Sequence, residues 1–276
     1  MPILVDLNQV VISNLMQQIN ITKNEQVEEA FLRHMILNSL RSFKNKFGEE
    51  YGDMVICNDT TNYWRKKIFP YYKANRKKSR DNSIFDWNVI FQILNKIKDE
   101  IRENFPYRYI SVASCEADDI IATLTKKSCK EEKVLIVSGD KDFVQLFKYP
   151  NVKQYSPVQK KFVEESDPVE FLRQKCIYGD AGDGVPNIAS DDDTFATGRR
   201  QGRVTQKLIE QMQSNPRIKQ NWERNLRLIS FEYIPPEIEE AILLAYNEPI
   251  QGSHKKLYSY LINNKMKVLL TAYGEF

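Results

Sequence analysis

The chain has 276 residues, which is enough for one large domain or two smaller ones at roughly 100–200 residues each. Its hydrophobic fraction of 42% and charged fraction of 28% lie near the averages for globular proteins and exclude a wholly disordered chain. The net charge of +3 is small, so evidence for a nucleic-acid partner has to come from where the charges lie.

Cysteines and apolar segments indicate the compartment. The scattered cysteines Cys57, Cys115, Cys129 and Cys176 form no C-x-x-C pair, and no secretory signal opens the sequence, so we expect a reducing cytoplasm. No apolar run reaches the roughly 18 residues that a membrane-spanning helix needs. We therefore expect a soluble protein with no membrane partner.

Strands and helices alternate in the first part of the chain. Short apolar runs predict buried strands at 3–6, 54–57, 109–112 and 134–137. Apolar residues at helical spacing predict helices at 25–47, 84–104 and 117–127, with Gly48 ending the first. Strands that are apolar throughout indicate a mostly parallel central sheet with helices on both faces, so the predicted fold class is α/β.

Strand signals fade after about residue 161, and the remainder reads as mostly helical. Its predicted helices lie at 170–178, 203–213, 236–246 and 254–263. We therefore expect an α/β core at 1–165, which includes a basic segment at 60–83, followed by a smaller helical domain and tail at 166–276.

Acidic residues follow three of the predicted strands. In a parallel sheet the carboxyl ends of the strands form one rim, so Asp6, Asp59 and Asp140 are expected to lie together. Further candidates are Glu116, Asp118, Asp119, Asp142, Asp180 and Asp183. Each acid alone could be an ordinary turn or helix-cap residue.

The acids as a group favour metal binding. Two unit charges about 4 Å apart repel by about 4 kcal/mol at an effective dielectric near 20, so such a cluster needs cations. An all-oxygen ligand set indicates Mg²⁺, or Mn²⁺ in its place, and two such ions are suited to cleaving a phosphodiester. His34 and His254 are expected to be structural or surface residues.

A basic, aromatic segment follows Asp59. Residues 65–80 hold eight basic residues and no acidic one, interleaved with Phe69, Tyr71 and Tyr72. Such a segment suits a single strand bound through phosphates and stacked bases, although a solvated basic loop is the alternative. The candidate nucleic-acid contacts here are Arg65, Lys66, Lys67, Tyr72, Lys73, Arg76, Lys77, Lys78 and Arg80. If the segment is helical, Lys73 and Arg76 share a face and both reach one phosphate.

These motifs, in this order, resemble the flap endonuclease and 5′-nuclease superfamily, and within it the enzymes of T-even-type bacteriophages. The matching segments are 4–6, 63–65, 71–76, 116–119, 140–143, 149–154, 179–180 and 275–276. The resemblance implies a 5′-to-3′ exonuclease and flap endonuclease with a PIN-like core. Its role would be to remove RNA primers from lagging-strand fragments during phage DNA replication in the cytoplasm of an infected bacterium.

The resemblance also implies roles for individual residues. Asp6, Asp59, Glu116, Asp118 and Asp140 would hold the metal ion nearer the scissile phosphate, and Asp142, Asp180 and Asp183 would lie nearer the second ion. Lys73, Arg76 and Asp118 are the candidate catalytic residues. The implied substrates are RNA–DNA hybrid and nicked, flap and fork DNA, and a single-strand-binding protein is a further candidate partner of a monomeric enzyme.

Two segments depart from the family pattern. Asp59 is closer to Tyr63 than expected, so a neighbour could replace it as a ligand. Residues 186–193 replace a Gly-rich, cation-binding hairpin and end in three aspartates, which we expect to repel phosphate. Contacts to duplex from Arg199, Arg200 and Arg203, just beyond, remain expected.

Two further questions stay open at this level. The C-terminal residues 269–276 either fray or pack on the protein, or they form a docking peptide for a sliding clamp. The whole chain could also be a nucleic-acid-binding replication module without catalysis, or a PIN-type endoribonuclease.

Overall fold

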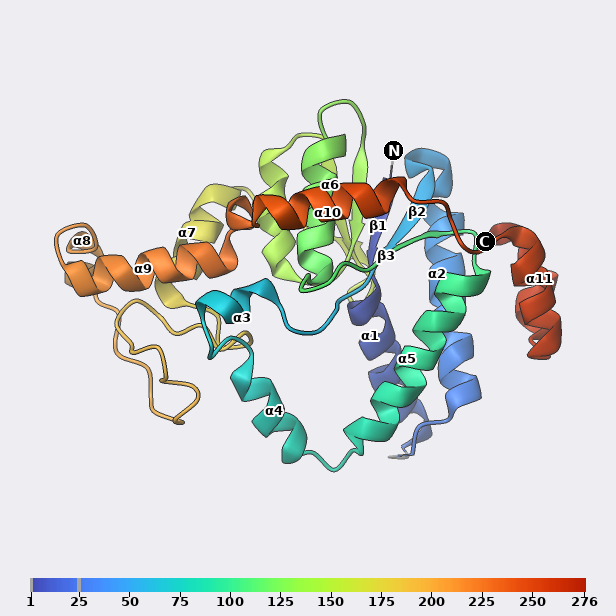
Figure 1. The fold of residues 1–276 in the computed structure, drawn as a ribbon, viewed down its shortest axis with the longest axis horizontal. Coiled ribbons are helices and arrows are strands. Elements are labelled where there is room, and N and C mark those ends of the chain that lie inside the picture. The colour runs from blue at the N-terminus through green and yellow to red at the C-terminus, as the bar shows by residue number, and fades with distance from the viewer. Residues whose placement is uncertain (1, 24–25) are drawn as a thin grey trace.

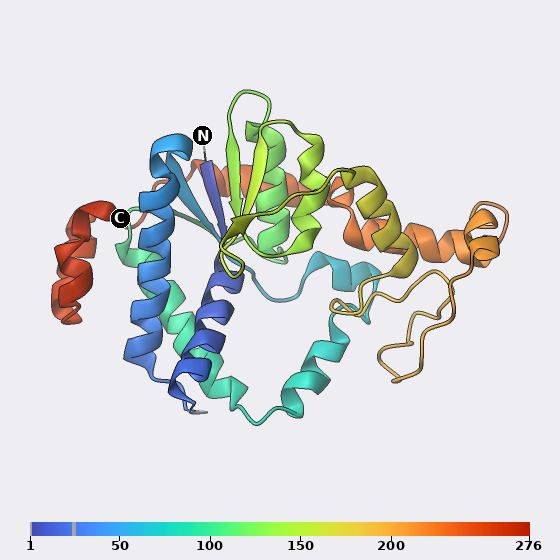
Figure 2. The same ribbon diagram turned by 180° about the vertical axis from the view of Figure 1, so that it is seen from behind.

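A six-stranded sheet runs through the middle of the molecule (Figure 1 and Figure 2). The computed structural model describes residues 2–23 and 26–276, without the side chains of residues 77–79. The strands are β1 (Pro2–Asp6), β2 (Asp53–Cys57), β3 (Arg108–Ile110), β4 (Val134–Val137), β5 (Val152–Ser156) and β6 (Lys161–Phe162). Their order is β3-β2-β1-β4-β5-β6, and only β6 pairs antiparallel with its neighbour. The α/β class and the predicted strands are confirmed, although β3 ends two residues early.

The last two strands were not predicted, because β5 lacks a continuous apolar run. Its sequence, VKQYS, mixes polar and apolar residues, yet Gln154 is fully buried. The Gln154 side chain donates to the main-chain oxygens of Ser138 and Asp140 at 2.8 and 2.6 Å. Those hydrogen bonds compensate for the burial of a polar side chain in a strand.

Alternating residues of the central strands face two separate layers of helices. Ile3 and Val5 of β1 pack with α1 (Leu7–Thr22), α2 (Glu29–Tyr51) and α5 (Trp87–Asn104), whereas Leu4 packs with α6 (Ala117–Ser128) on the other face. Successive side chains of a strand point to opposite faces, so both faces are buried. Also on the α6 side lies η1 (Lys141–Lys148).

Two helical predictions in this half were incomplete. Helix α2 does not stop at Gly48 but continues to Tyr51, and Gly52, with a φ of 72°, ends it. A residue at positive φ favours glycine, so the helix stop belongs at position 52. Helix α1 was not predicted.

Residues 166–276 are mostly helical, as predicted, apart from a long loop at 179–205. The helices are α7 (Pro168–Tyr178), α8 (Gln206–Glu210), α9 (Pro216–Ile229), η2 (Phe231–Tyr233), α10 (Pro236–Asn247), α11 (His254–Asn263), α12 (Lys267–Thr271) and η3 (Tyr273–Glu275). Helix α9 was not predicted, and α8 is shorter than expected. None of the described helices is long and apolar enough to cross a membrane.

The C-terminal chain returns to the core after α9. Ile242 of α10 is buried with α6, and Leu257 of α11 is buried with α5. Gly252 allows this return, because a Cβ there would lie 1.9 Å from the main-chain oxygen of Phe105. The expected division at residue 165 therefore does not separate two independent hydrophobic cores.

The C-terminal tail packs on the protein. The Phe276 side chain is only 5% exposed, and its ring lies against that of Phe105 with centroids 5.5 Å apart. Glu275 pairs with Arg41 of α2 at 2.5 Å. Of the two readings of residues 269–276, packing is the one that the structure adopts.

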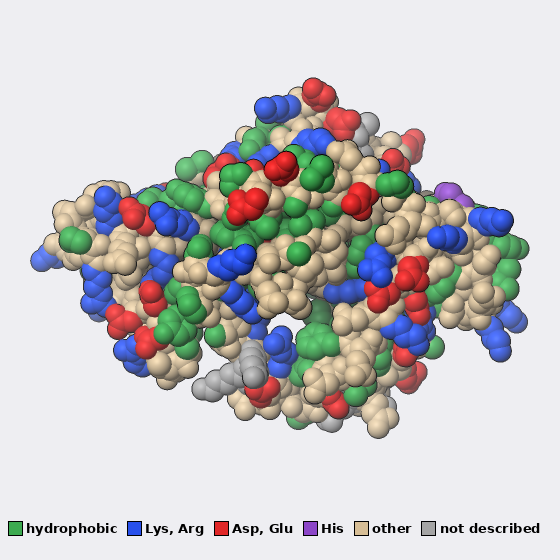
Figure 3. Space-filling view, in the orientation of Figure 1, with side chains coloured by type: hydrophobic (Ala, Val, Ile, Leu, Met, Phe, Trp, Pro, Cys, Tyr) green, Lys and Arg blue, Asp and Glu red, His purple; other side chains and the backbone are tan. Residues whose placement is uncertain are grey.

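Helices α3 (Trp64–Ile68), α4 (Ala74–Asp81) and α5 form an arch beside the carboxyl ends of the strands (Figure 1). The chain descends through α3 and α4 and rises again along α5, so α5 is the second limb of the arch. Figure 3 shows an opening between the limbs, bordered by Lys and Arg side chains. The basic segment predicted at 60–83 forms the first limb.

Candidate active site at the carboxyl ends of the strands

Acidic residues from four elements meet at the rim of the sheet. Asp6 ends β1 and caps α1, where it accepts hydrogen bonds from the Gln9 main-chain N–H and the Ser138 hydroxyl, both at 3.0 Å. Asp59 follows β2 and accepts the main-chain N–H of Ala117 at 2.6 Å, which holds the loop after β2 against the start of α6. Asp118 lies in the first turn of α6, and Asp140 follows β4 and caps η1.

Mutual repulsion dominates the electrostatics of this rim. Burial, and after it the charge of Asp59, raises the pKa of Asp6 to about 7. Burial and the charges of Asp140 and Asp6 hold the pKa of Asp118 well above its ordinary value. Among the described residues, no group donates a hydrogen bond to Asp118 or forms an ion pair with it. The rim is therefore a set of carboxylates short of positive charge.

A second acidic group is bridged by a lysine. Lys175 of α7 pairs with Asp142 and also with Asp180, whose Oδ2 lies 2.8 Å from its ammonium. The other oxygen of Asp180 accepts the Gly182 main-chain N–H at 2.8 Å. Sequence reasoning missed Lys175, because no motif marks a helical lysine as the partner of acids in two different loops.

A third group joins the first limb of the arch to the acids. Lys73 pairs with Glu116 and lies 3.7 Å from Asp183, and Arg76 pairs with Asp183 at 2.5 Å. Lys73 has a φ of 57°, and its main-chain N–H donates to the Asp183 carbonyl at 2.7 Å. Burial raises the pKa of Asp183, but Lys73 and Arg76 outweigh it and leave that pKa below its ordinary value.

Tyr72 does not offer its ring to nucleic acid in this arrangement. The side chain is 3% exposed, and its hydroxyl donates to Asp183 at 2.9 Å and lies 3.1 Å from Glu116. The predicted stacking role is therefore not supported. Tyr72 instead fixes two of the acids.

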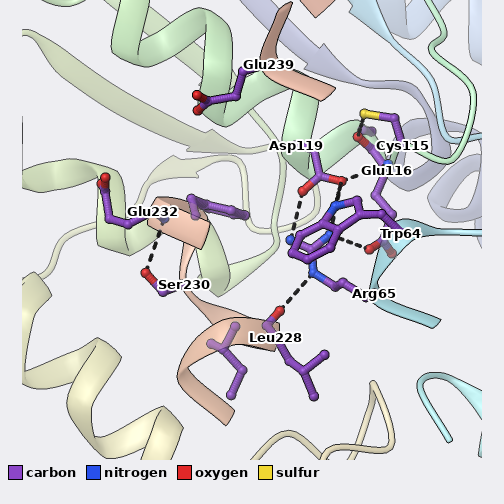
Figure 4. Close-up of polar contacts among 12 residues, drawn as sticks. Trp64, Arg65, Cys115, Glu116, Asp119, Leu228, Ser230, Glu232 and Glu239 are labelled. Carbon is purple, nitrogen blue, oxygen red and sulfur yellow. Dashed lines mark hydrogen bonds and ion pairs between the residues drawn. The ribbon is translucent and has the colours of Figure 1, made fainter. Parts of the chain in front are cut away.

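Arg65 is also turned inward (Figure 4). It is 3% exposed and pairs at 2.8 Å with both Glu116 and Asp119, and its Nε donates to the Leu228 carbonyl at 2.8 Å. Asp119 is fully buried and also accepts the Trp64 indole N–H at 3.0 Å. In this arrangement Arg65 and Asp119 satisfy each other in the interior, so the structure does not present Arg65 to nucleic acid or Asp119 to a metal ion.

The other predicted basic contacts lie on the surface. Lys66, Lys67, Arg76, Arg80, Arg199, Arg200 and Arg203 are exposed, and the side chains of Lys77 and Lys78 lie outside the described residues. The aspartates at 191–193, which we expected to repel phosphate, are each paired with an arginine. Asp191 pairs with Arg217 at 2.6 Å, Asp192 with Arg224, and Asp193 with Arg199.

The residues present fit hard divalent cations in chemistry. The available ligands are carboxylate oxygens, and Asp118 forms no ion pair with any side chain that the structure describes, although the charge of Lys73 acts on it from a distance. Within the described residues, no three acidic, histidine or cysteine side chains converge tightly enough to hold an ion as they stand. Lys73 and Lys175 bridge acids that would otherwise face one another, so those two groups need their lysines to move before an ion binds.

Lys98 of α5 is a basic residue near the rim that sequence reasoning missed. Its ammonium contacts the Asn8 side-chain oxygen. Burial lowers the pKa of Lys98, and the negative charges of Asp59 and Asp6, which act in the opposite direction, do not fully compensate. The available signal was its spacing. Lys98 follows Leu94 by four residues and so lies at the edge of the buried face of α5.

Comparison with known proteins gives matches over the whole chain. Residues 3–175 match the family model described as the N-terminal, resolvase-like domain of 5′-3′ exonucleases, and residues 169–276 match that of the C-terminal part of T4 RNase H. The chain is 34% identical to the ribonuclease H of Enterobacteria phage T4, covering 99% of this chain and 95% of that protein. It is 30% identical to the flap endonuclease Xni of Shewanella sp. over 46% of this chain and 48% of that protein.

The fold is shared with solved structures of phage T5 proteins. A T5 flap endonuclease in a pseudo-enzyme–product complex with DNA and metal ions matches with a TM-score of 0.64 at 14% identity, covering 96% of this chain and 99% of that one. A T5 5′-exonuclease with bound zinc matches with a TM-score of 0.60 at 15% identity and the same coverage. At such low identity the likeness shows the fold alone.

Proposed function

The chain belongs to the 5′-3′ exonuclease family, and we propose that it removes nucleotides from the free 5′ end of RNA–DNA hybrid and of nicked, flap and fork DNA. Its relatives are named ribonuclease H, 5′-3′ exonuclease and flap endonuclease, and the chain is accordingly a nuclease. One observation carries the proposal: an acidic rim short of positive charge lies beside an arch whose first limb is basic.

The proposed cofactor is a pair of Mg²⁺ ions, for which Mn²⁺ can substitute. The ligands nearer the scissile phosphate are Asp6, Asp59, Glu116, Asp118 and Asp140, and those nearer the second ion are Asp142, Asp180 and Asp183. Bound there, the ions would activate a water and stabilise the leaving oxygen. Asp119 is left out of this set, because Arg65 holds both of its oxygens, whereas Arg65 holds only one oxygen of Glu116 and the other pairs with the Lys73 ammonium.

The basic residues of the first limb hold the substrate phosphate. Lys73 and Arg76 pair with Glu116 and Asp183, so their charges already lie at the acids. When a phosphate enters, their donors turn from these carboxylates to its oxygens and help to neutralise the charge of the transition state. Lys73 is suited to this role, because its side chain is only 9% exposed and its ammonium already lies against Glu116 at the rim.

The proposed setting is phage DNA replication in the cytoplasm of an infected bacterium, where RNA primers of lagging-strand fragments are the substrate. The similarity to a phage T4 protein supports it. A single-strand-binding protein and a sliding clamp are the expected partners of a monomeric enzyme. Docking of a clamp through the tail would require Phe276 to leave its contact with Phe105.

The decisive experiment compares 5′-labelled hybrid, nicked and flap substrates with magnesium present. We expect short products from the 5′ end and release of intact flaps, with loss of both activities in Asp118→Asn. Asp53→Asn is the matched control, because Asp53 is fully exposed at the opposite end of β2. Binding without hydrolysis in magnesium or manganese would favour the binding module, and cleavage confined to internal RNA bonds would favour the endoribonuclease.

A further inference from the structure

The second limb of the arch carries a lysine with an unusual environment. Lys73 and Arg76 lie on the first limb, whereas Lys98 lies on α5, the second limb (Figure 1), and Figure 3 shows an opening between the limbs. Its ammonium contacts Asn8, which lies in the first turn of α1, two residues after Asp6. Lys98 is thereby held beside the acidic rim.

Lys98 differs from other lysines near it in having no carboxylate partner. Among the described residues it forms no ion pair, and its contact is with the neutral amide oxygen of Asn8. Lys96, on the same helix, is exposed and pairs with Glu29 at 2.6 Å, and Lys175 pairs with two aspartates.

The partly buried ammonium of Lys98 has only a neutral direct partner, and the charges of Asp59 and Asp6, which form no ion pair with it among the described residues, offset its desolvation only in part, so its pKa stays below the ordinary value. The ammonium carries three donors, of which Asn8 takes one. Lys98 is therefore a cation beside the acidic rim with donors that no other described group accepts.

We propose that Lys98 binds a backbone phosphate of the strand that enters the arch, from the side opposite to Lys73 and Arg76. This inference rests on the proposed nuclease function. Phosphate oxygens would accept the free donors of Lys98 while Asn8 keeps the side chain extended towards Asp6. Contacts from both limbs would fix the strand across the rim and so set which bond lies at the acids.

The test uses the full-length protein and a 5′-flap DNA, with calcium in place of magnesium for binding and magnesium for cleavage. Lys98→Gln retains a side chain able to bond Asn8 but removes the charge, and Lys98→Arg retains the charge. Lys96→Met is the control on the same helix. Affinity is measured from about 50 to 200 mM salt, because each phosphate contact on a single strand contributes about 0.7 to the slope of log K against log salt.

We expect Lys98→Gln to make the salt dependence shallower by about 0.7 in slope and to reduce the affinity at about 0.1 M salt by about fivefold. Lys98→Arg and Lys96→Met should bind like the unsubstituted protein. An unchanged slope in Lys98→Gln would overturn the proposal, even if cleavage or the melting temperature fell, because a purely structural role does not change the number of phosphates bound. Absence of binding and cleavage in the unsubstituted protein would instead refute the proposed function.

Discussion

Replacing Arg65 by methionine tests the structure where it differs most from what the sequence predicted, since Arg65 was expected to contact nucleic acid and is buried instead. The change removes the cation shared by Glu116 and Asp119, which are 1% and 0% exposed. It also removes the donor to the Leu228 carbonyl, which joins α3 to the end of α9. A long apolar side chain keeps the volume, so the charge is the main loss.

The expected cost follows from leaving buried charges unpaired. Removing one partner of a buried ion pair costs about 3–5 kcal/mol. Glu116 keeps Lys73, but Asp119 keeps only the neutral donors of Trp64 and the main chain. At a melting-temperature change of about 2–4 °C per kcal/mol for a chain of this size, the fall is roughly 10 °C.

Urea and thermal unfolding measure the change, with Arg102→Met as the control. Arg102 pairs with Asp99 on the surface, where such pairs contribute about 0–1 kcal/mol. The salt dependence of nucleic-acid binding is measured under conditions where both variants are folded. A loss of stability below about 1 kcal/mol together with a shallower salt slope would refute the buried role and restore Arg65 as a phosphate contact.

Three other predictions concern the acids and the tail. Magnesium is expected to raise the melting temperature by relieving repulsion at the rim, and Asp118→Asn to reduce that rise; equal melting curves with magnesium and with chelator would contradict this. In chelator, the free energy of unfolding should increase as pH falls from about 7 towards 3.8, because in this range Asp6 binds a proton in the folded protein but not in the unfolded chain. Asp6→Asn should flatten this part of the pH profile of stability. Phe276→Ala should lower the free energy of unfolding by about 3 kcal/mol in urea titrations, and no change would show that the tail is free.

The chain alone was sufficient for much of the fold, since its central strands are continuous apolar runs. A run such as 134–137 is buried on both faces whatever surrounds it, and each such strand ends in a polar turn. Strand β5 was not predicted because it contains the polar residue Gln154. This side chain can be buried only because it donates to main-chain oxygens after β4, and the sequence around β5 does not reveal those acceptors. The helix end predicted at Gly48 was wrong because α2 tolerates a glycine within it. The helix ends only at Gly52, where the backbone adopts a positive φ.

The sequence by itself determined that Asp6, Asp59 and Asp140 share a rim, because the ends of parallel strands lie on one edge. Only the tertiary structure decided which charged side chains face that rim and which face inward. The sequence marked Arg65 as a nucleic-acid contact and did not mark Lys98, yet Arg65 is enclosed by two carboxylates, whereas Lys98 contacts a neutral amide beside the rim. The reason is physical: strand and helix periodicity is a local property, whereas the partner of a charge is supplied by elements far away in the sequence.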